Sequence, residues 1–153
     1  MSDLHPADQK LLSDVERFGW HIIHVMSDEK GPGWSYTIGL FKTFMHPEVV
    51  ITGFDKGLTQ VLLNNLGRDI KNGKTFAHGK YYNDILDDVK CRMLNVEKEK
   101  YHDHFGYAKW YYKTDDFPVL QCVCPTVEGV FPWDADARED FVAFQPLLCK
   151  LKK

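Results

Sequence analysis

The feature that most constrains the fold is a change of hydrophobic period near the middle of the chain. Four large aliphatic side chains recur there at four-residue steps: Leu58, Leu62, Leu66 and Ile70. This spacing predicts an amphipathic helix over residues 55–73. Asp55 can accept hydrogen bonds from the first free N–H groups, and Asn72 with Gly73 supplies a left-handed stop. The residues before this helix alternate with a period of two instead, which is typical of strands.

Strands and helices are predicted in separate groups along the chain. Strands are predicted within residues 20–29, 34–40, 47–54, 88–96 and 118–126, and further helices within 6–18, 97–113 and 138–148. Because the first three strands follow one another through short connections, we expect them to pair as an antiparallel meander. This order predicts an α+β domain with a mostly antiparallel sheet and helices covering one face, organised as a single domain over residues 1–153.

Composition excludes several classes of protein. The chain has 153 residues and a formal net charge of −3, and its Lys and Arg residues are scattered rather than gathered in a stripe. We therefore expect neither nucleic acid nor membrane as a partner. The first ten residues carry acids where a secretion signal would carry basic residues, so a cytoplasmic protein is predicted. Oligomeric state and cofactors are not indicated by the sequence.

Four cysteines are present, at positions 91, 122, 124 and 149. In the predicted strand, Cys122 and Cys124 point to the same face as Leu120. Free cysteine usually behaves as a small buried hydrophobe, and a metal site needs further ligands in space. We therefore predict reduced thiols, with no metal bound.

The segment between the second and third strands carries polar groups suited to chemistry. Lys42, His46 and Glu48 lie within seven residues, and Pro47 restricts the backbone between the last two. Imidazole and carboxylate groups exchange protons near neutral pH, so this turn is a candidate site. Motifs typical of serine hydrolases, P-loop proteins and dinucleotide-binding proteins are absent from the sequence.

Several stretches together resemble a known family. "GWHIIHV", "WSYTIGLFKTFMHPEVVITGF", "LLNNLGRDIKNGKTF", "AKWYY", "FPVLQCVCP", "GVFPWD" and "FQPLL" are similar, in this order, to the bacterial domain of unknown function 4262 family, over about residues 11–148. The resemblance implies a small α+β domain and assigns no reaction. The chain departs from the expected pattern at Cys124, where the family resemblance leads us to expect tryptophan. The family's motif positions are occupied here by Tyr36, Thr37, Gly39, His46, Pro47, Glu48, Gly53, Gln121, Phe131, Pro132, Trp133, Gln145 and Pro146.

The leading functional hypothesis is a binding module. We expect a pocket between the sheet and the C-terminal segment that takes a small aromatic or nucleotide-like ligand, because polar and aromatic motif residues recur on elements far apart in the sequence. His46 and Glu48 would be polar anchors of this pocket. Its other ligand-binding residues would be Tyr36, Thr37, Lys42, Gln121 and Trp133.

Two alternatives remain open. In the first, the protein is a small hydrolase or lyase in which His46 is the general base and Glu48 orients it, with Tyr36 or Lys42 stabilising negative charge. In the second, it is a structural or interaction protein without a small-molecule site, because Pro, Gly and Trp in its motifs serve folding as readily as function. The position of His46 relative to Glu48 distinguishes the first alternative from the others.

Overall fold

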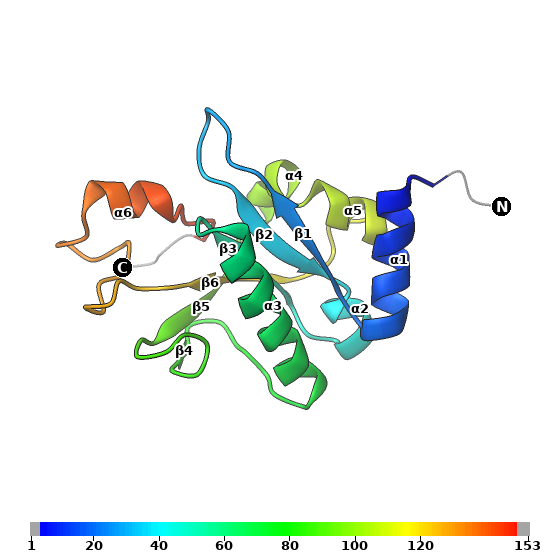
Figure 1. Cartoon of the computed structure of the whole chain (residues 1–153), viewed down its shortest axis with the longest axis horizontal. Coiled ribbons are helices and arrows are strands. Elements are labelled where there is room, and N and C mark those ends of the chain that lie inside the picture. The colour runs from blue at the N-terminus through cyan, green and yellow to red at the C-terminus, as the bar shows by residue number, and fades with distance from the viewer. Residues whose placement is uncertain (1–3, 150–153) are drawn as a thin grey trace.

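The computed structural model describes residues 4–149, which form a six-stranded sheet in the order β1-β2-β3-β6-β5-β4 (Figure 1). The strands are β1 (His21–Val25), β2 (Trp34–Ile38), β3 (Glu48–Thr52), β4 (Tyr81–Tyr82), β5 (Cys91–Asn95) and β6 (Val119–Val123). The helices are α1 (Pro6–Phe18), α2 (Leu40–Phe44), α3 (Lys56–Lys71), the 3-10 helix η1 (Lys98–Lys100), α4 (Tyr101–His104), α5 (Gly106–Tyr112) and α6 (Glu139–Phe144). Neighbouring strands are antiparallel except β3 and β6. The predicted α+β class with a mostly antiparallel sheet is confirmed.

The parallel pair β3–β6 lies at the centre of the sheet. The chain leaves β3, forms α3 and the β4–β5 hairpin, and returns through α4 and α5 to place β6 beside β3. Parallel strands need such a long connection, and no local pattern specifies which strand the returning segment joins. The predicted β1-β2-β3 meander is present, whereas the position of β6 could not be deduced from spacing.

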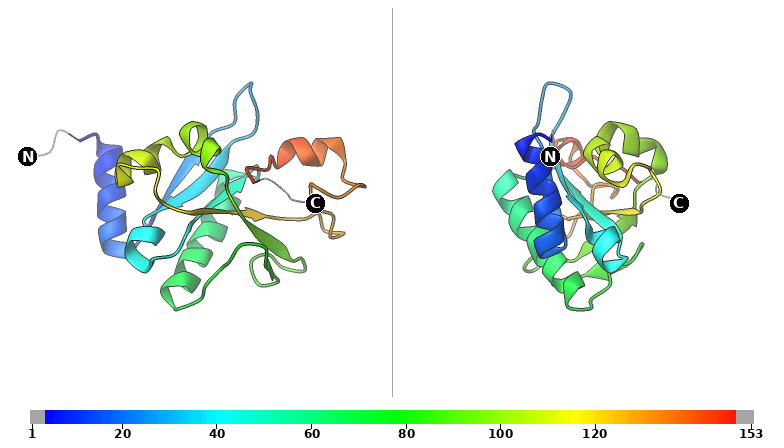
Figure 2. Two further views of the ribbon diagram at one scale, coloured as in Figure 1. Left: turned by 180° about the vertical axis from the view of Figure 1, so that it is seen from behind. Right: turned by 90° about the vertical axis from the view of Figure 1, so that its right-hand side faces the viewer.

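Helices cover both faces of the sheet, a difference from the predicted single face (Figure 2). Val49 and Ile51 pack with the apolar side of α3, whereas Val50 packs on the opposite side with residues of α4 and α5. Every residue of β3 and β6 is buried. Strands that are buried on both faces read as continuous apolar runs, and "EVVIT" and "VLQCV" have this character more than strict alternation.

The two longest helices begin and end as predicted. Gly19 ends α1 with a φ of 103°, a left-handed conformation that glycine adopts without strain. The Asp55 carboxylate accepts a hydrogen bond of 2.9 Å from Leu58 N at the start of α3. The predicted helix over 97–113 is divided instead into η1, α4 and α5, and Phe105, whose φ of −127° is not helical, separates α4 from α5. Among residues 4–149, no helix is long and apolar enough to cross a bilayer.

The connection between β2 and β3, predicted as a turn, contains the short helix α2. Gly39 and Met45 flank this helix, and both have left-handed backbone conformations. A Cβ atom at Gly39 would lie 2.7 Å from Gly19 O, so glycine is also required here for close packing. Five residues are too few for a clear helical period, which is why the sequence pattern missed α2.

Two glutamines fasten the C-terminal segment to the sheet. The Gln145 side chain accepts a hydrogen bond from Cys124 N at 2.8 Å and donates one to Cys124 O at 2.7 Å. Cys124 directly follows β6, and its backbone is bonded by the amide as it would be by a residue of a neighbouring strand. The amide takes this role beyond the end of β3. Gln121 accepts a hydrogen bond from Leu148 N at 2.8 Å and donates to Pro146 O at 2.9 Å. We call these contacts the glutamine clasp.

Replacing Gln145 with leucine keeps the side-chain size but leaves the buried N–H and C=O of Cys124 unpaired. Each buried unpaired polar group costs about 1–3 kcal/mol, so we expect Q145L to lower the free energy of unfolding by about 2–6 kcal/mol in urea denaturation. The exposed Gln9 is the matched control, and Q9L should change stability by less than about 0.5 kcal/mol. Equal losses in the two variants would contradict the clasp.

Candidate functional site

The Glu48 carboxylate is buried at the first turn of α2, with 1% of the residue exposed. Five donors surround it: Thr37 Oγ1 at 2.8 Å, Gly39 N at 2.9 Å, Leu40 N at 3.1 Å, Phe41 N at 3.2 Å and the Tyr112 hydroxyl. Burial raises the pKa of Glu48, and the hydrogen bonds from Tyr112 and Thr37 oppose that rise. The hydrogen bonds of its oxygens therefore join β3 to α2 and α5.

Both ring nitrogens of His46 are bonded to the backbone. Its Nδ1 lies 2.8 Å from Pro47 O, and its Nε2 accepts a hydrogen bond of 2.9 Å from Phe76 N. This pairing requires the proton to be on Nδ1. Burial lowers the pKa of His46. Glu48 is not a partner of this ring, so the two residues do not form the dyad that the hydrolase hypothesis requires, and His46 offers no free nitrogen.

The other predicted binding residues lie apart from one another. Tyr36 is buried with Phe105 on the α4–α5 side of the sheet, whereas His46 contacts Phe76 on the α3 side. Trp133 belongs to a third cluster, where its ring is stacked on Phe131 at 4.7 Å. The remaining three serve in other places: Thr37 holds Glu48, Gln121 belongs to the clasp, and Lys42 is exposed with its ammonium over the Tyr111 ring.

A hollow of about 540 Å³ does adjoin the C-terminal segment at Thr52, Pro146 and Leu148. Much of its wall comes from the loop over residues 28–33, and none of the predicted binding residues lines it. The predicted site residues are therefore brought into the fold but not into one pocket.

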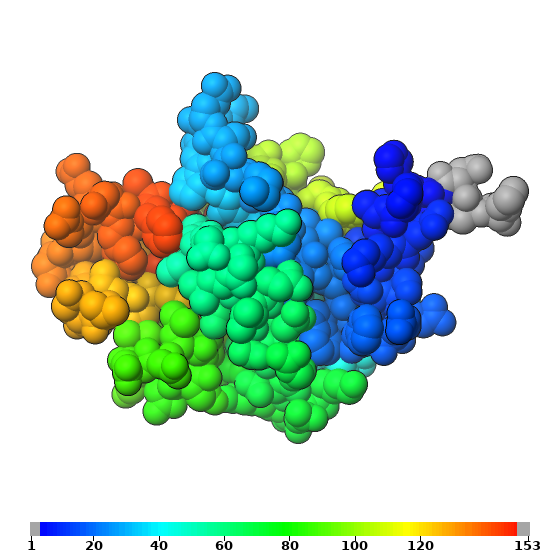
Figure 3. All heavy atoms as spheres, viewed as in Figure 1, coloured from blue at the N-terminus to red at the C-terminus, as the bar shows by residue number. Residues whose placement is uncertain are grey.

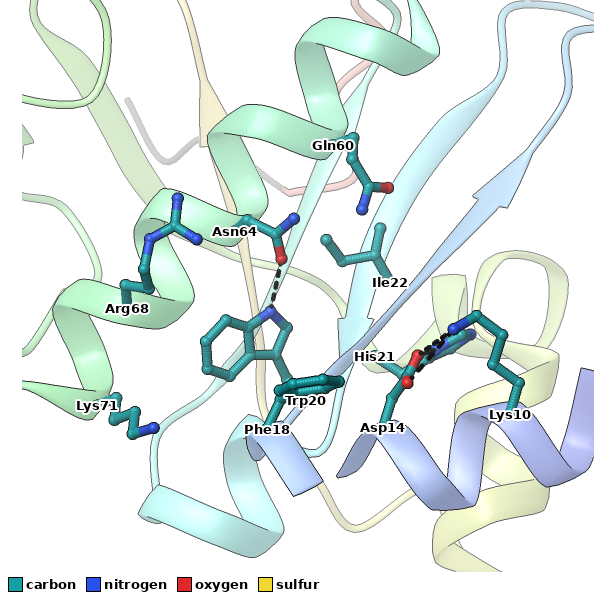
Figure 4. A pocket seen from close by; sticks show the side chains of 10 residues that line it. All are labelled: Lys10, Asp14, Phe18, Trp20, His21, Ile22, Gln60, Asn64, Arg68 and Lys71. Atoms are coloured by element: carbon teal, nitrogen blue, oxygen red, sulfur yellow. Dashed lines mark hydrogen bonds and ion pairs between the residues drawn. The ribbon is translucent and has the colours of Figure 1, made fainter. Parts of the chain in front are cut away.

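A cleft of about 530 Å³ lies between α1 and α3, above β1 (Figure 4). Figure 3 shows the face of the molecule on which the two helices border it. Its lining combines aromatic rings, amides and charged groups from three elements and the residues between them: Lys10, Asp14, Phe18, Trp20, His21, Ile22, Gln60, Asn64, Arg68 and Lys71. Concave sites of this size with a few convergent polar groups are typical of small-molecule pockets.

Trp20 forms an aromatic wall of the cleft and is fixed from two sides. Its indole N–H donates to Asn64 Oδ1 at 3.1 Å, as Figure 4 shows. The ring packs on α3 at Gly67, where an added Cβ would lie 2.5 Å from the ring. Phe18 lies beside Trp20 and is 50% exposed. The cleft thus has one immobilised ring and one that solvent or a ligand can reach.

A carboxylate–imidazole pair stands on the α1 side of the cleft. His21 Nδ1 lies 2.7 Å from Asp14 Oδ2, and Lys10 Nζ lies 3.3 Å from the same oxygen. Among residues 4–149, the structure gives no hydrogen-bond partner to His21 Nε2. Asp14 therefore fixes the orientation of an imidazole whose second nitrogen is available.

The α3 side of the cleft presents a polar stripe, and this is the signal that sequence reasoning passed over. Gln60, Asn64 and Arg68 recur at four-residue steps beside the apolar positions that predicted the helix. Residues four apart lie on the same helix face, so such a stripe can line one side of a pocket. No sequence pattern could indicate that α1 would lie opposite this stripe.

Replacing Glu48 with glutamine tests the buried carboxylate. The amide has one acceptor oxygen for five donors, and its own N–H groups would face other donors. We expect E48Q to lower the free energy of unfolding by at least about 3 kcal/mol in urea denaturation. The exposed Glu128 provides the control, and E128Q should stay within about 0.5 kcal/mol of the parent protein. If E48Q lowers the free energy of unfolding by less than about 1 kcal/mol, the structural role assigned to Glu48 is refuted.

The His46 contacts predict a pH dependence of stability. The pKa of His46 is lowered in the folded state, so its contribution is present above the unfolded pKa of about 6.5 and is lost as pH falls toward the folded pKa. The stability gap between the parent protein and H46A should therefore be larger at pH 7.5 than at pH 5.5. The exposed His102 is the control, and H102A should change stability by less than about 0.5 kcal/mol at pH 7.5. Parallel stability curves for H46A would contradict the assignment.

Comparison with known proteins places the chain in one family. The profile of the family described as "Domain of unknown function (DUF4262)" matches residues 14–138. No curated protein and no solved structure matches the chain. The matched region contains strands β1 to β6. It also contains Glu48 and the two residues whose side chains donate hydrogen bonds to it, Thr37 and Tyr112. The chain therefore belongs to the DUF4262 family.

Proposed function

We propose that this protein binds a small anionic ligand that carries an aromatic ring, in the cleft between α1 and α3. The observation that supports this proposal is the combination, in one cleft, of an aromatic wall with cationic groups on both sides. The predicted ligand class, aromatic or nucleotide-like, is retained from the sequence analysis. Its place moves from the C-terminal segment to the cleft, because the residues first expected to bind it lie in separate clusters.

The charges of the cleft favour an anion. Lys10, Arg68 and Lys71 line it, and Asp14 is the carboxylate among its lining residues. Asp14 is already paired with His21 and Lys10. Arg68 offers a planar set of donors that matches phosphate or carboxylate oxygens. An incoming anion would thus meet cations whose charge Asp14 offsets in part.

The aromatic part of a ligand has its own partners. A planar ring can pack against the exposed Phe18, which lies beside the buried Trp20, and aromatic pairs contribute about 0.5–1.5 kcal/mol beyond the area they bury. Gln60 and Asn64 place amide groups nearby, although each already has a partner, His24 Nε2 at 2.7 Å and the Trp20 indole respectively. Recognition would therefore rest on the ring and the cations, with the amides adjusting the fit.

The Asp14–His21 pair favours a second candidate function. A hydrolase or lyase needs an oriented base near its substrate, and His46 has no free nitrogen for that role. His21 has an available Nε2 beside the same cleft and a carboxylate 2.7 Å from its Nδ1. If the ligand is also a substrate, His21 would be its general base in place of His46.

Adenosine monophosphate is a suitable probe, with adenosine and inorganic phosphate as its two halves. We expect the monophosphate to bind more tightly than either half and to shift the Trp20 indole N–H resonance in NMR titrations. The double variant R68A/K71A should weaken binding at least about tenfold, equivalent to about 1.4 kcal/mol.

The control for charge is the double variant K80A/K113A, which removes two exposed cations away from the cleft. It should leave the affinity for adenosine monophosphate unchanged. An unmoved Trp20 resonance at millimolar probe, or equal affinity in R68A/K71A and K80A/K113A, would overturn the proposed binding site. If the parent protein converts the bound adenosine monophosphate, and H21A binds it without converting it, the hydrolase or lyase hypothesis is supported. Binding by the parent protein without conversion would reject that hypothesis.

A further inference from the structure

Three buried cysteines meet on one face of the β5–β6 pair. Their sulfur atoms, from Cys91, Cys122 and Cys124, all lie within 4.8 Å of one another. The Sγ atoms of Cys91 and Cys124 are 3.4 Å apart. None of the three side chains is exposed. The face shared by Cys122 and Cys124 follows the predicted strand alternation, whereas the arrival of Cys91 depends on the long-range pairing of β5 with β6.

Met93 extends this cluster to four sulfur-containing residues. The strand register pairs Met93 with Cys122, and Arg92 with Val123, so the next pair outward is Cys91 with Cys124. Directly paired residues share a face, and Met93 is also fully buried in the same core cluster. The result is a two-by-two array of sulfur side chains on the α3 side of the sheet.

We propose that Cys91, Cys122 and Cys124 form a binding site for a soft metal ion, and that Cu(I) is the ion their sulfur-only environment favours. Thiolate and thioether ligands select Cu(I), zinc and iron–sulfur centres. Structural zinc sites almost always have four ligands. Among residues 4–149, no histidine, aspartate or glutamate joins this group of three cysteines.

The distances suit a metal bound by three sulfurs. Metal–sulfur bonds of about 2.3 Å in a plane place the sulfurs about 4 Å apart. The Cys91–Cys124 separation of 3.4 Å needs to widen by a few tenths of an ångström, and every pair lies within 4.8 Å. Side-chain rotations of this size leave the strand pairing intact.

Thiolate is the form of cysteine that binds metals, so Cu(I) held by Cys91, Cys122 and Cys124 takes the place of protons on these thiols. Metal binding is therefore coupled to the release of protons.

The test measures metal in protein expressed with added copper or zinc and isolated under anaerobic, reducing conditions. We expect about one copper per chain, retained against the Cu(I) chelator bicinchoninate, with sulfur as its ligand in X-ray absorption. The triple variant C91A/C122A/C124A should lose the metal, and the control C149A should keep it. If the triple variant does not fold, C91A and C124A each leave two thiols and should bind at least about tenfold more weakly than the parent protein.

Three results would overturn the proposal. The first is a copper content that does not depend on the cysteines. Either the folded, fully reduced parent protein holds less than about a tenth of an equivalent of copper, or the parent protein and the triple variant hold equal amounts. The second is retention of zinc in preference to copper, which would reject Cu(I) as the ion. The third is a Cys91–Cys124 disulfide found by peptide mapping in place of bound metal. None of these results depends on whether the α1–α3 cleft binds a ligand.

Discussion

The structure depends on a single buried carboxylate that organises the middle of the chain. Glu48 begins β3, and its oxygens accept hydrogen bonds from the first turn of α2, from Thr37 on β2 and from Tyr112 on α5. A buried charge is tolerated when it is fully hydrogen-bonded, and here the donors come from elements far apart in the sequence. Thr37 Oγ1 also accepts a hydrogen bond of 3.0 Å from Val49 N, so the same group joins β2 to β3 directly. The contact therefore fixes the helix–strand connection and one covering helix together.

Local pattern accounted for much of the fold. The apolar stripe of α3 and the strands β1, β2 and β3 each follow from short-range periodicity, and the structure confirms them. Features that local pattern missed include the helix α2, which is too short for a clear helical period, and the place of β6 beside β3. Helix α2 forms because Glu48 supplies its cap, and β6 joins β3 because Glu48 N donates to Pro118 O and the register continues from there. Both depend on partners that sequence spacing does not identify.

The candidate site was harder to predict than the fold for a physical reason. His46, Glu48 and Gln121 were chosen because their side chains are chemically versatile, and that versatility is used internally. Buried polar groups are nearly always paired, so motif residues inside a small domain tend to bond with each other or with the backbone. The cleft residues Arg68 and Lys71 are exposed and look ordinary in the sequence. They line a cleft only because α1 lies across from α3, and no motif specifies that arrangement.

The backbone and the side chain of Cys124 have separate partners. The resemblance in sequence leads us to expect tryptophan there, and a large indole would occupy the space where the sulfur atoms of Cys91 and Cys124 meet. The backbone of residue 124 bonds to Gln145 through its N–H and C=O, and these contacts do not depend on the side chain. The glutamine clasp can therefore persist in either form, whereas the sulfur cluster requires cysteine at this position. Fold alone does not determine which sites a chain carries, so the metal site that we propose rests on the side chain of Cys124 and not on the fold.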